Sequence, residues 1–134
     1  MVDVKAMVQT LQALGTKVTA SECREKDLNG AYHPDNDLLV ICVNALQDDD
    51  PASLWDVLAH EATHKMQACV GGPIMPPSHV GRMMRELIAI YPEAVAVLGA
   101  YPSGHSRLEL EARWIELQPP EFVLTALQIA CRRG

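Results

Sequence analysis

The segment between Asp50 and Gly71 carries the signals of one long helix at both of its ends. Asp50 is a favourable N-cap residue, and Pro51 suits the first position of a helix. At the other end, the Gly-Gly-Pro run at residues 71–73 is a typical helix stop. Apolar residues recur between these ends with helical spacing, at positions 54, 57, 58 and 62. The sequence therefore predicts a helix that begins at Pro51 and ends near Gly71.

The rest of the chain combines short strands with further helices. Residues 38–43 (LLVICV) are apolar on both faces and partly β-branched, which is typical of an internal strand. Residues 30–33 form a second candidate strand, and the turn residues 34–37 between the two indicate a hairpin. A third short strand is expected at residues 16–19. Further helices are expected at about residues 3–14, 78–90 (with Ser78 as the N-cap), 93–98, 106–117 and 120–131. This order predicts one α+β domain of residues 1–134, in which a small mixed or antiparallel sheet packs on a helical bundle.

Composition narrows the classes of partner. The chain has 134 residues, of which 49% are hydrophobic and 21% are charged, as in a globular protein with a real core. Its net charge of −6 argues against nucleic acid or an anionic membrane surface as the main partner. Residues 3–14 have helical spacing and not the apolar run of a signal peptide, and no segment approaches the ~20 apolar residues of a membrane span. We therefore expect a cytoplasmic protein.

The four cysteines, Cys23, Cys42, Cys69 and Cys131, stand alone without a C-x-x-C pair. A structural zinc site built from cysteines is therefore not indicated. The apolar neighbours of Cys42 favour buried thiols. One or two disulfides are the alternative, and the spacing does not define their pairing.

The predicted helix of residues 51–70 contains the sequence HEATH at residues 60–64. Residues four apart lie on one face of a helix, so His60 and His64 can place two imidazoles on one metal ion. Glu61 is offset by about 100° from His60 and can accept a proton from a water that zinc activates. Burial of these three groups beside the apolar stripe is costly unless a metal compensates them. The motif therefore predicts a catalytic zinc site with Glu61 as general base.

A catalytic zinc site needs a third protein ligand. The extended signature H-E-x-x-H-x-x-G-x-x-H is absent, because Gln67 and Val70 occupy its glycine and last histidine positions. The ligand must therefore come from elsewhere in the chain. The candidates are Glu109, Glu111, Glu116, His79 and His105.

Helical periodicity separates the three glutamates. Apolar residues at positions 108, 112 and 115 define a stripe that includes Glu111. Glu109 and Glu116 lie with Arg113 on the opposite, charged face, where they can form ion pairs. Ser106 and Glu109 also match a capping box, which gives Glu109 a structural role. We therefore expect Glu111 to be the third ligand, with Glu109 or a histidine as the alternative.

The HEATH segment, followed far downstream by Glu111-Ala112, resembles the gluzincin branch of zinc metallopeptidases. The resemblance covers about residues 30–116 in layout and the two motifs in detail. It implies a zincin-like fold, a peptide or protein substrate, and zinc held by His60, His64 and Glu111. The chain looks like small HExxH proteins of bacteria and bacteriophages, so an association with a phage or virion is included in the expectation.

The same resemblance implies two further features. The strand ahead of the HExxH helix, at residues 29–33, is expected to bind extended substrate by β-augmentation. Gluzincins stabilise the oxyanion of the reaction with a tyrosine or a histidine, and Tyr101 and His105 precede the Glu111 helix. Asp56, four residues before His60, is either an outer partner of that imidazole or an early-helix acid that complements the dipole.

Two other classes of protein fit parts of the sequence. A zinc-binding structural or interaction protein would keep the ligands and show little or no hydrolysis. A metal-free helical adaptor would carry HEATH by coincidence. The intact Glu61 favours the hydrolase, because a structural zinc site has no use for a base.

Overall fold

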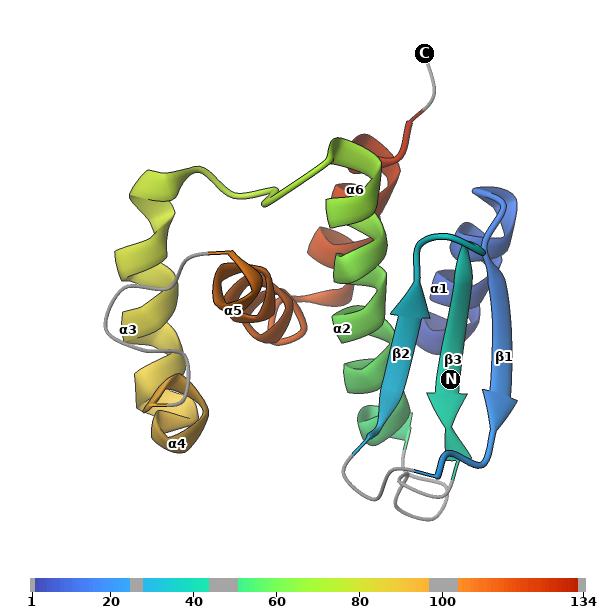
Figure 1. The fold of residues 1–134 in the computed structure, drawn as a ribbon, viewed down its shortest axis with the longest axis horizontal. Coiled ribbons are helices and arrows are strands. Elements are labelled where there is room, and N and C mark those ends of the chain that lie inside the picture. Colours follow the sequence, from blue (N-terminus) through green and yellow to red (C-terminus); the bar gives the residue numbers. More distant parts are fainter. Residues whose placement is uncertain (1, 25–27, 44–50, 97–103, 133–134) are drawn as a thin grey trace.

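A computed structural model describes residues 2–24, 28–43, 51–96 and 104–132 (Figure 1). Its elements, in chain order, are α1 (Val2–Ala13), β1 (Lys17–Ser21), β2 (Gly30–His33), β3 (Leu38–Cys42), α2 (Pro51–Val70), a 3₁₀ turn (Pro77–His79), α3 (Val80–Ile90), α4 (Pro92–Ala96), α5 (His105–Ile115) and α6 (Pro120–Ala130). The predicted combination of helices with a small sheet, an α+β fold, is confirmed. Within these described ranges, no helix has both the length and the apolar character that crossing a membrane requires.

The helix α2 runs through the middle of the molecule (Figure 1). It contacts β2, β3 and α1 on the side of the sheet, and it contacts α5 and α6 within the helical half. Gly71 follows α2 with a φ of 83°, a left-handed conformation that glycine adopts without strain. The predicted helix and its stop are confirmed, whereas the predicted N-cap, Asp50, lies outside the described residues.

The sheet has three strands in the order β1-β3-β2. The central strand β3 pairs in parallel with β1 and antiparallel with β2, so the sheet is mixed. The predicted internal strand and hairpin are confirmed, because the apolar run is the central strand and its Leu39 is fully buried. β2 is therefore an edge strand, and it lies beside α2 (Figure 1).

The helix α5 packs between α2 and α3, and five of its 11 residues are buried. It begins at His105 after Gly104, and no side chain caps its N-terminus. The predicted capping box of Ser106 and Glu109 is therefore wrong, because Ser106 lies inside the helix and the Glu109 carboxylate has other partners. The predicted cap at Ser78 is also wrong, because that residue lies in the 3₁₀ turn ahead of α3.

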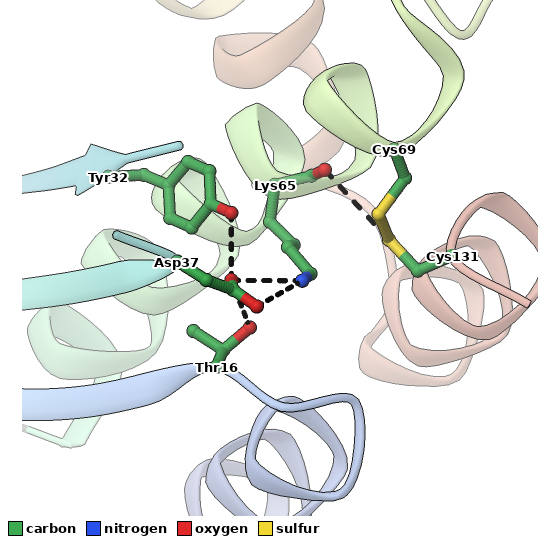
Figure 2. The surroundings of a disulfide bond; sticks show 6 residues. All are labelled: Thr16, Tyr32, Asp37, Lys65, Cys69 and Cys131. Atoms are coloured by element: carbon green, nitrogen blue, oxygen red, sulfur yellow. Dashed lines mark hydrogen bonds and ion pairs between the residues drawn. A yellow bond between two sulfur atoms is a disulfide. The ribbon is translucent and has the colours of Figure 1, made fainter. Parts of the chain in front are cut away.

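All four cysteines form disulfides, Cys23 with Cys42 and Cys69 with Cys131. The expectation of buried thiols is therefore wrong. The first disulfide joins the segment after β1 to the end of the neighbouring strand β3. The second joins the last turn of α2 to the residue that follows α6, across 62 positions of the sequence (Figure 2). Such a pairing depends on how α2 and α6 pack, which residue spacing does not reveal.

A polar cluster fixes the hairpin turn to α2 (Figure 2). Asp37, at the end of the turn, has a φ of 49° and accepts hydrogen bonds from Lys65, Thr16 and Tyr32. The Lys65 Nζ lies 2.9 Å from both carboxylate oxygens, and this lysine is 5% exposed. Since Lys65 directly follows His64, the ion pair holds the β2–β3 hairpin against the part of α2 that carries HEATH.

This cluster predicts a pH dependence of stability. Partial burial alone would raise the pKa of Asp37, but the hydrogen bonds from Lys65, Thr16 and Tyr32 outweigh it and hold the pKa below its usual 3.8. A carboxyl with a depressed pKa contributes stability above its unfolded pKa and loses it as the pH falls toward the folded value. We expect Asp37→Asn to lower the free energy of unfolding by about 2 kcal/mol at neutral pH, as measured by urea titration.

Asparagine is the matched substitution, because it keeps the shape of the side chain and tolerates a positive φ. The difference between Asp37→Asn and the wild type should shrink as the pH falls below about 4, because the carboxyl of the unfolded chain takes up a proton before that of the folded chain does. A difference that is constant between pH 7 and pH 2 would show that the charge of Asp37 does not stabilise the fold.

Candidate metal centre

A groove of about 1260 Å³ lies over α2, between the edge strand β2 and the helix α5. The α2 residues that line it include His60, Glu61 and His64 of the HEATH segment. Glu109 of α5 and Glu116, which directly follows α5, also line it. The predicted helical spacing of the histidines is confirmed, since their ring centroids lie 5.1 Å apart. The groove thus gathers the titratable groups of two helices that are far apart in the sequence.

Glu109 lies between the two histidines. Its Oε2 is 3.3 Å from Nε2 of His60, and its Oε1 is 2.9 Å from Nε2 of His64. Each of the three residues offers one ligand atom, and these atoms all lie within 4.8 Å of one another. Two imidazole nitrogens and one carboxylate oxygen form the donor set of a common type of catalytic zinc site. These three residues could therefore hold a metal ion with one face open to the groove.

The other ring nitrogens of the histidines have acceptors of their own. Nδ1 of His60 is 3.1 Å from Oε1 of Glu116, and Nδ1 of His64 is 2.8 Å from Oε1 of Gln67. Because a carboxylate and an amide oxygen only accept hydrogen bonds, both Nδ1 atoms carry the proton. In the neutral rings, the lone pairs of both Nε2 atoms then point toward Glu109. Outer partners of this kind orient metal-binding histidines and fix their tautomers.

The charges of the cluster are strongly coupled. Burial alone would lower the pKa of His60, but hydrogen bonds to Glu109 and Glu116 outweigh it and raise the pKa to about 10. The pKa of His64 is raised in the same way, by Glu109 and Gln67, and hydrogen bonds to both histidines hold the pKa of Glu109 well below its usual range. Without a metal, Glu109 thus favours the protonated form of both imidazoles. Metal binding would displace those protons.

Glu61 is 8% exposed and lines the groove. Its carboxylate makes no hydrogen bond or ion pair with any described residue, although it lies next to His60 in the sequence. Burial is the main cause that raises its pKa. A carboxylate that is buried, has no fixed partner and faces a groove is typical of a general base.

Glu111 is fully buried, but the structure places it away from the histidines. Its carboxylate accepts hydrogen bonds from Gln67 Nε2 at 3.0 Å and from the backbone N–H groups of Ile74 and Met75 at 3.0 and 2.8 Å. These donors satisfy the charge without a metal, so Glu111 anchors the loop after α2 onto α5. The third position next to the histidines, predicted for Glu111, belongs to Glu109 in this arrangement.

The remaining predicted residues have mixed outcomes. His105 is exposed at the start of α5 and lines the groove, so a role in oxyanion stabilisation stays a prediction. Tyr101 lies outside the described residues. His79 lies in the 3₁₀ turn and does not line the groove. Asp56 lines the groove, but Glu116 and not Asp56 is the residue hydrogen-bonded to Nδ1 of His60.

The sequence did not indicate Gln67 and Glu116 as partners of the histidines. Gln67 follows His64 by three positions and is hydrogen-bonded to it on the same face of α2. Glu116 follows Glu109 by seven positions, so both reach α2 from the same face, where Glu116 is hydrogen-bonded to His60. These spacings are the only sequence pattern that points to the two residues. They indicate partners of the histidines only once the packing of α5 against α2 is known.

Gly30 permits the close approach of β2 to α2. A Cβ atom there would lie 2.7 Å from Val57 Cγ1, 2.9 Å from the carbonyl oxygen of Val40 and 3.3 Å from Glu61 Cγ. We expect Gly30→Ala to lower the free energy of unfolding by about 1–3 kcal/mol, because the strand or α2 must shift to relieve the clash. Gly72→Ala is the matched control, since a Cβ at Gly72 would meet no atom within 4 Å. Equal effects of the two substitutions in urea titrations would contradict this close approach.

Comparison with models of known protein families, with characterised protein sequences and with solved structures gives no match. The chemistry of the groove is therefore inferred from its own residues.

Proposed function

We propose that the chain is a zinc-dependent peptide hydrolase with a zincin-like fold. In this proposal His60, His64 and Glu109 hold the metal, and Glu61 is the general base. The observation that carries the proposal is the arrangement of the imidazoles, whose Nε2 atoms meet at one carboxylate while their Nδ1 atoms donate to Glu116 and Gln67. An ordinary pair of surface histidines has no need of fixed tautomers on both rings.

The hydrolytic role rests on Glu61. A zinc ion bound at the three ligands would supply a Lewis acid and bring the pKa of a coordinated water near neutrality. Glu61 then accepts the proton from water as the water oxygen attacks the peptide carbonyl, and delivers it to the leaving amine as the C–N bond breaks. Its lack of a fixed partner leaves the carboxylate free for both transfers, and its raised pKa suits a group that takes up and releases a proton.

The groove supports an extended peptide as the substrate. Its volume of about 1260 Å³ exceeds the size of most small-molecule pockets. The edge strand β2 lines it, and the side of β2 that faces away from β3 is the side on which a substrate strand could pair. The substrate would thus run along β2 and pass over Glu61.

Two alternatives make different predictions about the metal. A structural or interaction protein would bind zinc at the same residues without turnover, but Glu61, which has no hydrogen bond or ion pair among the described residues, would have no purpose in such a site. A metal-free helical adaptor would bind no zinc, and the position of both Nε2 atoms next to Glu109 would be a coincidence. A zinc-dependent hydrolase accounts for that position and for Glu61.

The metal content of purified and reconstituted protein tests the proposed site. We expect one zinc per chain in the wild type. Glu109→Ala should lower the zinc affinity by more than about 100-fold, because loss of a residue that only supports a ligand already lowers metal affinity by about 10- to 100-fold. Glu111→Ala should keep its zinc and unfold at lower urea concentration, since it leaves two backbone N–H groups without their acceptor.

Glu121→Ala, an exposed position on α6, is the matched control for loss of a carboxylate. Zinc that survives Glu109→Ala and is lost in Glu111→Ala would move the third ligand to Glu111. Absence of zinc from reconstituted wild-type protein would refute a metal-dependent function altogether.

A further inference from the structure

Arg113 is the one permanently charged cation among the described residues that line the groove. It lies on α5, four positions after Glu109 and three positions before Glu116, so all three residues project from the same face of the helix. Its side chain is exposed. A cation thus stands next to the proposed metal ligand in a groove that otherwise carries several carboxylates.

The two acids on the same face, Glu109 and Glu116, do not pair with Arg113. Glutamates at these spacings would ordinarily pair with an arginine, but Glu109 and Glu116 are both hydrogen-bonded to the histidines of α2. Arg113 itself has no ion pair or hydrogen bond within the described part of the chain. Its guanidinium is therefore available to a ligand in the groove.

We propose that Arg113 binds a carboxylate of the peptide substrate and so selects substrates that carry one close to the cleaved bond. This proposal rests on the peptide-hydrolase function proposed above. A guanidinium presents two parallel N–H groups that match the two oxygens of a carboxylate, which gives both affinity and orientation. An amide or a neutral side chain at the same place lacks the charge and one of the acceptors.

The position of Arg113 limits where the carboxylate can be. One helical turn, about 5.4 Å, separates it from the ligand Glu109, and an extended peptide advances about 3.3 Å per residue. The carboxylate therefore lies within about two residues of the cleaved bond. It is either the C-terminal carboxylate, which would make the protein remove short C-terminal fragments, or an acidic side chain next to the cleaved bond.

Equilibrium binding of three short alanine peptides separates these cases. One has a free C-terminal carboxylate, one has a C-terminal amide, and one has a C-terminal amide and a single glutamate. Binding is measured to zinc-loaded Glu61→Gln protein, which does not turn the peptides over, and to the same protein with Arg113→Gln or Arg85→Gln. Arg85 is an exposed arginine of α3 that does not line the groove, and it is the matched control.

We expect a carboxylate-bearing peptide to bind about 10- to 100-fold more tightly than the plain amide. That preference should vanish in Arg113→Gln and persist in Arg85→Gln. Preference for the free acid identifies the terminal carboxylate, and preference for the glutamate peptide identifies a side chain. Equal affinity for all three peptides, a preference that survives Arg113→Gln, or no binding of any peptide would each overturn the proposal.

Zinc content is measured on the same samples, so that the two proposals fail separately. If the protein does not take up zinc, the hydrolase proposal fails and the peptide comparison is made on the metal-free protein. If zinc is bound and the peptides bind without discrimination, only the role of Arg113 is refuted.

Discussion

Glu61→Gln is expected to lower peptide hydrolysis by the zinc-loaded protein by about 10²- to 10⁴-fold, the contribution typical of a general base. Glutamine keeps the size of the side chain but cannot accept the proton of the attacking water. Zinc content should be unchanged, because Glu61 is not among the three residues whose ligand atoms meet. The measurement is the rate of cleavage of a peptide library, with zinc content determined on the same preparation.

Glu121→Gln on the exposed side of α6 is the control for a change of charge outside the groove. It should hydrolyse the library at the wild-type rate. Undiminished hydrolysis by Glu61→Gln would exclude Glu61 as the base, even if zinc is bound. Stoichiometric zinc with no hydrolysis by the wild type would favour the structural role of the metal.

Local patterns in the sequence were sufficient to predict most elements. The end signals predict the helix that the structure has at residues 51–70, and the apolar, partly β-branched run 38–43 predicts the strand that the structure has at residues 38–42. Both patterns reflect local rules, namely the hydrogen-bonding needs of helix ends and the burial of both faces of an internal strand. The caps at Ser78 and Ser106 were wrong because backbone conformation at Gly104 and the 3₁₀ turn set the helix starts instead.

The glutamates of α5 show where periodicity fails. It correctly placed Glu111 on the buried face of α5 and Glu109 on the opposite face. The error was to assume that a buried carboxylate without a local partner needs a metal. Its partners are backbone N–H groups 36 and 37 positions away in the loop after α2. On the polar face, conversely, Glu109 and Glu116 contact the histidines of α2.

Removal of the Cys69–Cys131 disulfide should produce the largest loss of stability. The bond closes a loop of 62 positions, and the chain-entropy relation for such a loop gives a loss of ~4 kcal/mol in the free energy of unfolding. For Cys23–Cys42, with a separation of 19, the same relation gives ~3 kcal/mol. We expect the double variants Cys69→Ala/Cys131→Ala and Cys23→Ala/Cys42→Ala to follow this order in urea titrations. The total free energy of unfolding of a domain of this size is only about 5–15 kcal/mol.

The wild type titrated with and without a reductant provides the control. The reduced protein should lose at least as much stability as either double variant, whereas the fully alanine-substituted protein should not respond to the reductant. A wild type that does not respond would contain free thiols, as first expected from the sequence. Because disulfides are typical of oxidising compartments and rare in the cytosol, a response to the reductant would also count against the cytoplasmic location that we expected. The packing of α2 against α6 would then depend on the redox conditions around the protein. The placement of both histidines on α2 would depend on them too.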